Sequence, residues 1–157
     1  MKSKVQLSKF SLILSIAVMA ILAVGCVSTY ATDKFIIILA VTLLLLIFAM
    51  LYAPLTISAD EKQLRIHSLL KTHTIPMRRI VSVERHAPTM GVRRIFGSGG
   101  FMGYWGIFSE ADTGRYVAHH GKSSDCFLIR LDNGDKYLLG CQHPDAMIAH
   151  IKAHLPQ

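Results

Sequence analysis

Two long apolar segments near the N-terminus restrict the fold of this chain more than any other feature of its sequence. They cover residues 10–28 and 35–53, and neither contains a charged side chain. Each is about 19 residues long, and a helix needs roughly 20 apolar residues to cross the hydrocarbon core of a bilayer. The connection between them, Ala31–Lys34, is short and polar. The pattern therefore predicts an antiparallel hairpin of two transmembrane helices over residues 10–53.

Positive charges on either side of these segments predict their orientation. Three lysines precede the first segment and five Lys or Arg residues follow the second between residues 62 and 79, whereas the connection carries one Lys beside one Asp. The positive-inside rule places such basic ends in the cytoplasm. We therefore expect a basic cytoplasmic N-terminus over residues 1–9, a bacterial inner-membrane location and a soluble domain on the cytoplasmic side.

A signal-peptide interpretation of the first segment competes with the hairpin. Lys2–Lys9 resembles a basic n-region, and Leu22–Cys26 resembles the cleavage site of a bacterial lipoprotein. However, Ala23 stands where a larger aliphatic residue is usual, and a second apolar segment follows. A lipid-anchored protein would not need that second segment. We favour the hairpin and keep cleavage before Cys26 as the alternative.

The rest of the chain has the composition of one soluble domain. Charged residues make up 17% of the whole chain, below the roughly 25% of soluble proteins, because the apolar third contains almost none. Residues 55–157 are enough for a single hydrophobic core. The net charge of +7 is mild and forms no basic stripe, which argues against nucleic-acid binding. It suits a domain beside an anionic membrane surface.

Short alternating segments predict that this domain is mostly β. Aliphatic and β-branched residues alternate with polar ones in runs separated by turn residues. The expected strands are Leu55–Ser58, Leu64–His67, Thr72–Ile75, Ile80–Glu84, Arg115–His119, Cys126–Leu131 and Lys136–Cys141. The last segment, Ala146–Leu155, has helical spacing of apolar residues and follows Pro144. We therefore predict a barrel or sandwich of about seven strands, capped by a C-terminal α-helix.

The dipeptide Asn133-Gly134 predicts a two-residue hairpin turn. Asn-Gly favours a type I′ turn, because both central residues of that turn need a positive φ. The resulting register pairs Ile129 with Leu138 and Cys126 with Cys141, the latter within disulfide distance. A cytosolic domain would keep these two thiols reduced. One face of the hairpin would carry Phe127, Ile129, Leu131 and Leu138, and the other face Arg130 and Tyr137.

The order of these elements resembles the pleckstrin-homology (PH)-like superfold. The chain is similar to the bacterial PH-domain proteins that carry transmembrane helices before the domain. The resemblance rests on the Arg93–Gly97 start, the Gly- and aromatic-rich segment to Phe108, the hairpin at Asn133-Gly134 and the helix after Pro144-Asp145. It covers about residues 55–155. The resemblance implies a β-barrel capped by a helix and a binding or scaffolding role, and it supplies no catalytic residues.

The most unusual stretch, residues 93–108, is the candidate binding site. It contains five aromatic residues, five glycines and two adjacent arginines. Tyr, Trp and Arg are enriched at contacts with proteins and membrane interfaces, whereas glycines and aromatics also serve bent strands and barrel cores. Both interpretations stay open, because alternate side chains of a strand face opposite ways. The candidate binding residues are Arg93, Arg94, Phe96, Phe101, Tyr104 and Trp105.

Other chemistry finds little support in the sequence. Gly97, Gly99 and Gly103 superficially match a dinucleotide pattern, but that pattern needs a preceding strand and a following helix. His150 and His154 have helical i, i+4 spacing without an evident third metal ligand. No nucleophile–base motif or carboxylate pair stands out. We therefore expect no cofactor, no metal site and no enzymatic activity.

Three functions follow, in decreasing order of support. The first is a membrane-anchored, non-catalytic PH-like module that binds a protein segment or an anionic lipid headgroup at the membrane surface. Its partners would be membrane lipids and a membrane or cytoplasmic protein. The second is a small accessory or immunity-type membrane protein that acts through its hairpin, for which Leu43–Ile47 would matter most. The third is an enzyme that modifies a lipid, which would need a titratable cluster in a cleft.

Overall fold

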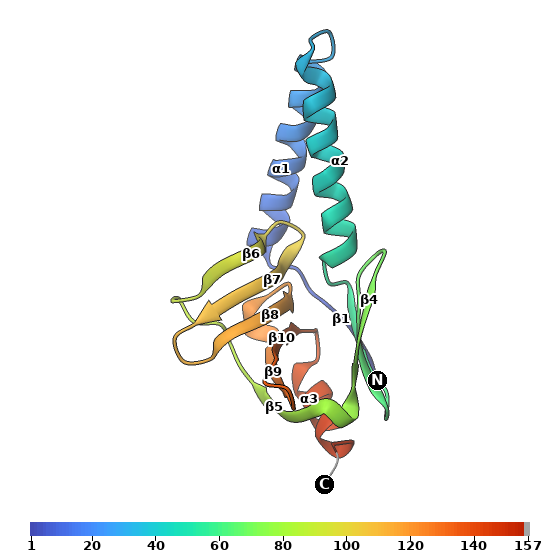
Figure 1. Cartoon of the computed structure of the whole chain (residues 1–157), viewed down its shortest axis with the longest axis vertical. Helices are drawn as coiled ribbons and strands as arrows, with labels where there is room; N and C mark the ends of the chain where they lie inside the picture. Colours follow the sequence, from blue (N-terminus) through green and yellow to red (C-terminus); the bar gives the residue numbers. More distant parts are fainter. Residues whose placement is uncertain (156–157) are drawn as a thin grey trace.

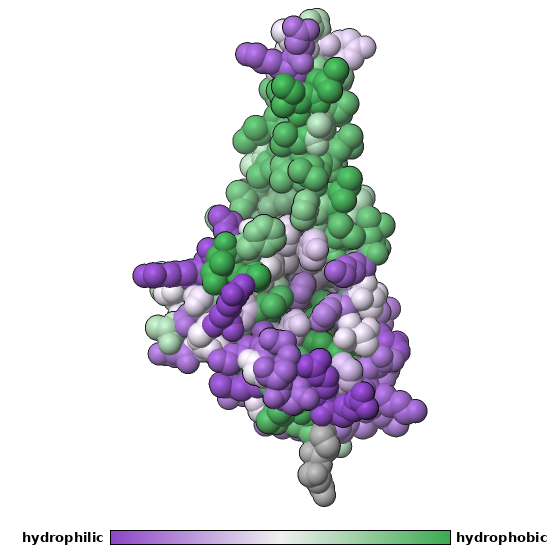
Figure 2. Space-filling view, in the orientation of Figure 1, coloured by the Kyte–Doolittle hydropathy of each residue, from purple (hydrophilic) through white to green (hydrophobic). Residues whose placement is uncertain are grey.

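The computed structural model describes residues 1–155 and places two long helices above a mostly β domain (Figure 1). Helix α1 covers Lys9–Ser28 and helix α2 covers Lys34–Tyr52. Ser8 caps α1, because its Oγ accepts a hydrogen bond of 3.0 Å from the backbone N–H of Ser11. Both helices are long and apolar enough to cross a membrane, and apolar side chains cover the surface they present (Figure 2).

The domain is a β-sandwich of two sheets with a C-terminal helix, which confirms the predicted fold class. The first sheet has the order β1-β2-β3-β4, and the second has the order β5-β9-β10-β8-β7-β6. All neighbours are antiparallel except β8 and β10. The strands are β1 Lys2–Lys4, β2 Thr56–Ala59, β3 Gln63–His67, β4 Thr72–Pro76, β5 Ile80–Arg85, β6 Arg93–Gly100, β7 Gly103–Glu110, β8 Gly114–His120, β9 Cys126–Leu131 and β10 Lys136–Gly140. Short 3-10 turns cover Met77–Arg79 and Ser123–Asp125.

Strand β1 precedes both helices in the sequence but belongs to the β domain that follows them. Ser3 pairs with Ile57, and the N–H of Val5 donates to the carbonyl of Leu55 at 2.9 Å. The chain therefore enters α1 from the sheet and returns to the same sheet when α2 ends. Both helices are anchored in one β domain rather than joined to it by a free linker.

The main core lies between the two sheets and is closed by α3, Pro144–Ala153. The helix supplies Met147, Ile148 and Ile151, and all three are buried. These residues have the helical spacing expected from the sequence. The sheets add Ile57, Leu64, Ile66, Ile75, Ile80, Val83, Phe127, Ile129, Leu131 and Leu139.

A second, smaller cluster covers the opposite face of the six-stranded sheet. Its buried members are Phe108, Tyr116, Ala118, Cys126, Leu128 and Leu138. Val92, at the end of the loop between β5 and β6, packs against it. This six-stranded sheet is therefore apolar on both faces, and the β5–β6 loop covers the face that the main core does not use.

The β9–β10 turn differs from the predicted type I′ turn. The N–H of Leu131 donates to Asp135 O at 2.9 Å, and the N–H of Gly134 donates to Leu131 O at 3.0 Å. Gly134 has a φ of 84°, whereas Asn133 has none of the positive φ that a type I′ turn requires. The loop therefore contains three residues, 132–134, and ends in a left-handed glycine.

This extra loop residue shifts the predicted register by one, and the expected pairs are wrong. Leu138 lies opposite Leu128, and Cys126 lies opposite Gly140 rather than Cys141. A shift of one residue moves every side chain to the other face, so Leu138 belongs to the second cluster while Tyr137 packs against the main core. Arg130 and Tyr137 accordingly do not share a face.

The register also separates the two cysteines that the sequence placed together. Cys126 lies in the second cluster and Cys141 in the main core, and both thiols are free and buried. Burial raises the pKa of each thiol. Both therefore behave as small apolar core residues.

Candidate functional site

The β6–β7 hairpin carries all six predicted site residues and lies directly beneath α1 (Figure 1). Strand β6 is an edge strand of the six-stranded sheet. At the hairpin tip, the N–H of Met102 donates to Ser15 Oγ at 2.8 Å, and Ser15 Oγ donates to the carbonyl of Ser11 at 2.6 Å. The tip is thus bonded to α1 well inside the apolar segment. A pair of buried serines in an otherwise apolar run is the sequence signal that could have indicated this contact.

Glycines allow this close approach of hairpin and helix. Gly100 has a φ of 137°, and a Cβ there would lie 2.8 Å from Leu14 Cδ2. Gly97 and Gly106 are cross-strand partners with positive φ, and a Cβ on either would collide with the backbone of the facing strand. These glycines serve a tightly twisted hairpin and form no phosphate-binding loop.

Trp105 and Tyr104 point to opposite sides of β7. Trp105 is 7% exposed, and its Nε1 donates to the carbonyl of Phe101 at 3.2 Å. Its ring stacks on Tyr52, the last residue of α2, with centroids 5.8 Å apart. Trp105 therefore fills the junction between domain and helix rather than an exposed binding surface.

Three of the predicted site residues, Arg93, Arg94 and Phe96, are exposed, and all three lie along β6. Ile95 and Phe96 are 55% and 62% exposed, and Arg93 and Arg94 are also exposed. Met102 is partly exposed beside the half-buried Phe101. Exposed apolar side chains that lie together and are bordered by polar residues are typical of surfaces that contact a protein or a membrane.

The turn between β3 and β4 is hydrogen-bonded to α2, as the β6–β7 tip is to α1. The N–H of Leu70 donates to the carbonyl of Met50 at 3.0 Å. Leu69 and Leu70 are about 60% exposed, and Lys71 Nζ lies 5.2 Å from the ring centroid of Tyr52. We use the name rim for the apolar and cationic side chains of these two turns and of β6 that are exposed or half-buried, apart from Arg94, which lines a cavity. The rim consists of Leu69, Leu70, Lys71, Arg93, Ile95, Phe96, Phe101 and Met102.

Tyr104 and Arg94 line a cavity on the side of the hairpin where the β5–β6 loop crosses the sheet. The cavity has a volume of about 600 Å³. Its walls come from Met90 and Val92 of the loop and from Tyr104, Phe108 and His120 of the sheet. Cavities of this size are typical of small-ligand sites.

A buried carboxylate holds the loop over this cavity. Glu110 is 4% exposed; its Oε1 accepts from the hydroxyl of Thr89 at 2.8 Å, and its Oε2 lies 2.9 Å from His86 Nε2. Burial pushes the pKa of Glu110 upward, but the hydrogen bonds from Thr89 and His86 outweigh it and lower that pKa. Burial, and after it the charge of Glu110, raises the pKa of Tyr116. This group was not anticipated, because residues 86 and 110 meet only through the tertiary fold.

Two adjacent histidines on β8 are buried and neutral. His120 is 4% exposed and stacks on Tyr104 with centroids 4.9 Å apart. Burial and the neighbouring His119 lower the pKa of His120 to about 4, and burial likewise lowers the pKa of His119 to about 4. Nδ1 of each ring is buried without a hydrogen-bond partner. His119 lies beside Tyr52 at the helix junction, whereas His120 lines the cavity.

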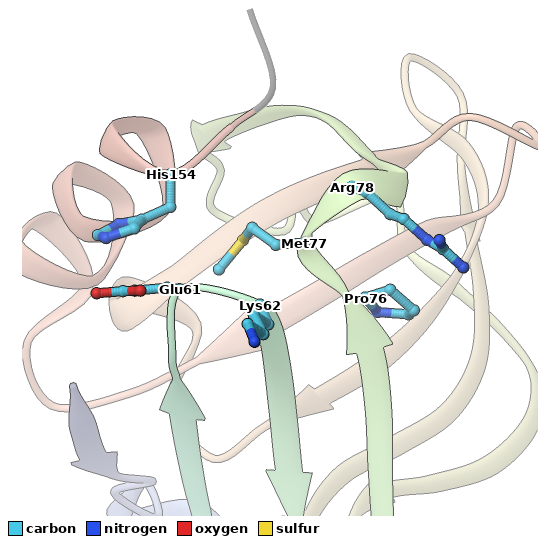
Figure 3. Close-up of a pocket in the computed structure, with 6 residues that line it drawn as sticks. All are labelled: Glu61, Lys62, Pro76, Met77, Arg78 and His154. Carbon is cyan, nitrogen blue, oxygen red and sulfur yellow. The ribbon is translucent and has the colours of Figure 1, made fainter.

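A second hollow lies at the end of the domain opposite the helices, near the end of α3 (Figure 3). Its lining residues are Glu61, Lys62, Pro76, Met77, Arg78 and His154. Arg78 points away from Glu61 and His154 in this view. The hollow carries none of the predicted site residues.

No metal-binding group is found within residues 1–155. No three His, Cys, Asp or Glu side chains gather there in a metal-binding group. The rings of His150 and His154 lie 4.6 Å apart, but His154 Nδ1 lies 2.8 Å from the carbonyl of His150, which is a helix-end contact.

Comparison with known families agrees with this architecture. The family model described as "Bacterial PH domain" matches residues 55–155, which span the domain from β2 to the end of α3. Searches of curated proteins and of solved structures give no match. PH domains are generally binding modules without catalytic activity. Because the match covers about two thirds of its length, the chain belongs to the bacterial PH domain family.

Proposed function

We propose that this protein is a membrane-anchored, non-catalytic module whose rim binds anionic lipid headgroups at the cytoplasmic face of a bacterial inner membrane. One observation carries the proposal. The strand nearest α1, β6, exposes Arg93, Ile95 and Phe96, while the tip of its hairpin is bonded to Ser15 inside the apolar segment of α1. A domain held this close to the helices has its rim at the level where headgroups would lie.

The composition of the rim supports lipid contact. Exposed aromatic and aliphatic side chains suit the boundary between headgroups and acyl chains. Lys71 and Arg93 lie among them, and Lys9 begins α1. Each cation near an anionic leaflet contributes about 1 kcal/mol. These three cations together would favour an anionic over a neutral bilayer by a few kcal/mol.

The cytoplasmic orientation rests on the distribution of charge. Pairing of β1 with β2 places Lys2 and Lys4 on the same side of the helices as the domain. The cations before α1 and after α2 therefore add on one side, whereas Lys34 on the other side has Asp33 beside it. The positive-inside rule favours the cytoplasm for the more basic side.

The test measures amide hydrogen exchange of β6 in the full-length protein. The protein is placed in nanodiscs of zwitterionic lipid, or of the same lipid with about one third anionic lipid. Anionic lipid should slow amide exchange in residues 93–96 of β6. High salt should remove this effect, because it screens surface charges. The variant Lys71→Glu/Arg93→Glu should lose the response, while Lys62→Glu/Arg78→Glu, at the opposite end of the domain, should keep it. If the folded wild-type protein shows the same amide exchange of β6 in zwitterionic and in anionic nanodiscs, the proposal is wrong.

A free edge strand also suggests a protein segment as partner, since β6 could accept an added strand. Two features oppose this alternative. The β6–β7 register shifts between Arg94 and Phe96, and bulges and exposed cations are devices that block edge pairing. The accessory-protein alternative, acting through Leu43–Ile47, predicts instead that substitutions in this exposed part of α2 change partner association while those in the rim do not.

A further inference from the structure

The cavity beneath the β5–β6 loop has the features of a ligand site and lies apart from the surface used in the proposed function. It opens on the face of the six-stranded sheet that the main core does not occupy. Its floor is apolar and aromatic, built by Tyr104, Phe108 and Val92. Met90, in the loop, is fully exposed beside it. An apolar floor with a free methionine at the mouth favours a ligand with a flexible hydrocarbon portion.

Arg94 is the only Lys, Arg, Asp or Glu residue among the residues of 1–155 that line the cavity. Arg94 lines it and lies across Gly99, where a Cβ would come within 3.1 Å of the guanidinium Nη1. Arg94 forms no salt bridge with any carboxylate of residues 1–155. The buried carboxylate of Glu110 is already paired with His86 and Thr89. The cavity therefore offers an uncompensated positive charge that suits an anion.

His120 adds a neutral donor on the same lining. It is 4% exposed, and its Nδ1 is buried without a partner. A neutral imidazole carries one proton, and placing it on Nε2 costs His120 no existing hydrogen bond. Because Nδ1 is enclosed, only the opposite edge of the ring, which carries Nε2, can face the cavity. An acceptor on a ligand would use this donor.

We propose that this cavity binds an amphiphilic organic anion. The carboxylate or phosphate of the ligand contacts Arg94 and His120, and its hydrocarbon portion lies on Val92, Tyr104 and Phe108. The same chemistry could come from a free fatty carboxylate in solution or from an anionic lipid of the bilayer. The proposal does not rest on lipid contact by the rim, because Arg94 lines the cavity and the rim is defined without it.

The probe is decanoate, added to the full-length protein in zwitterionic nanodiscs, with decanol as the uncharged counterpart and empty nanodiscs as the background. Equilibrium dialysis measures binding, and amide hydrogen exchange reports on residues 86–92. We expect saturable binding of decanoate, at least about 10-fold tighter than that of decanol, with slower exchange in the loop. The charge-assisted hydrogen bond of the anion supplies that factor.

Two matched variants locate the anion. Arg94→Gln should weaken decanoate about 10-fold without changing decanol, whereas Arg115→Gln, at an exposed position on β8 outside the cavity lining and the rim, should change decanoate less than 2-fold. His120→Phe keeps a ring against Tyr104 and removes the donor, so it should weaken decanoate by a smaller factor. Equal losses in the two arginine variants, equal binding of decanoate and decanol, or unchanged exchange in residues 86–92 would each overturn the proposal.

A final arm distinguishes the two sources of the anion. The measurement is repeated without decanoate in nanodiscs that contain anionic phospholipid. Slower exchange in residues 86–92 that depends on Arg94 assigns the cavity to a bilayer lipid, and a response to decanoate alone assigns it to a free amphiphile. Rim binding is read separately, from Lys71→Glu/Arg93→Glu and from exchange in β6. Either proposal can therefore fail while the other stands.

Discussion

The indole of Trp105 stacks on the phenol ring of Tyr52 at an interplanar angle of 17°, and this contact joins the β domain to the last residue of α2. Tyr52 stacks in turn on Phe48 with centroids 6.1 Å apart. A continuous aromatic stack therefore runs from the sheet into the helix. It complements the Met102–Ser15 hydrogen bond at α1, so each helix has its own attachment to the domain.

Removing the indole should loosen this attachment. Trp105→Ala should lower the free energy of unfolding by about 3 kcal/mol, because it deletes a large buried ring and leaves a cavity, and Trp105→Phe should cost less since a ring remains for stacking. Denaturant unfolding in detergent micelles measures both. Phe96→Ala, which removes an exposed ring from the same hairpin, should stay within about 0.5 kcal/mol. Equal effects of Trp105→Ala and Phe96→Ala would contradict a buried junction.

A side chain at Gly100 should destabilise the protein, chiefly because the backbone there has a φ of 137°. Gly100→Ala combines a φ of 137° with a contact of 2.8 Å to Leu14, and should destabilise the protein by more than about 1 kcal/mol. Exchange of the Met102 amide with solvent should also speed up, because relief of the strained φ shifts the hairpin tip and weakens its hydrogen bond to Ser15. Gly91→Ala is the matched control, since a Cβ there meets nothing nearer than Thr89 Oγ1 at 3.8 Å. Similar stabilities of the two variants would show that the tip does not contact α1 as described.

The outline of the fold could be predicted from the sequence because its strongest signals are local. Apolar runs without charges indicated two helices long enough to span a membrane. Alternating apolar and polar residues indicated strands, and apolar residues at helical spacing indicated the C-terminal helix. The β9–β10 register could not be predicted, because Asn133-Gly134 fits both a two-residue and a three-residue loop. One extra loop residue moves every side chain of β10 to the opposite face of the sheet from the predicted one.

The missed elements depend on distant parts of the chain. Strand β1 is three residues long, and its partner β2 follows only after both helices. Strands β6 and β7 are rich in glycine, which gives no alternating pattern, and they are shaped by contact with α1. Within the candidate site, the type of residue in 93–108 could be recognised, but not that Trp105 turns to the helix and Tyr104 to a cavity. The roles of His120 and Glu110 likewise arise only where separate strands meet.

Acidification should destabilise the domain through its buried histidines. The folded-state pKa of His119 and His120 is about 4, against the ordinary 6.5, so the unfolded chain binds more protons between these values. Stability is therefore complete above pH 6.5 and falls as the pH drops toward 4. One such histidine accounts for about 3 kcal/mol. Below pH 4.5, protonation of Glu110 adds to the loss, because its folded pKa is lowered from that value.

Unfolding free energies measured from pH 7.5 to pH 4 test this dependence. His120→Phe keeps the stack on Tyr104 and should flatten the curve between pH 6.5 and pH 4, and His119→Phe should act similarly. His67→Phe, at a half-buried position on β3, serves as the comparison. This variant should keep most of the decrease in unfolding free energy between pH 6.5 and pH 4. A wild-type stability that is constant from pH 7 to pH 4 would contradict burial of the two neutral rings.

Oxidation should not join Cys126 to Cys141. The two residues are not cross-strand partners, and their side chains enter different clusters on opposite faces of the six-stranded sheet. Burial also raises the pKa of both thiols, which keeps them protonated and slow to react. In the Cys26→Ser variant, treatment of the folded protein with an oxidant should leave both thiols free by intact mass, and both should react with a maleimide only after denaturation. The loss of two hydrogens on oxidation of the folded protein would instead restore the type I′ register, in which Asn133 and Gly134 alone form the turn.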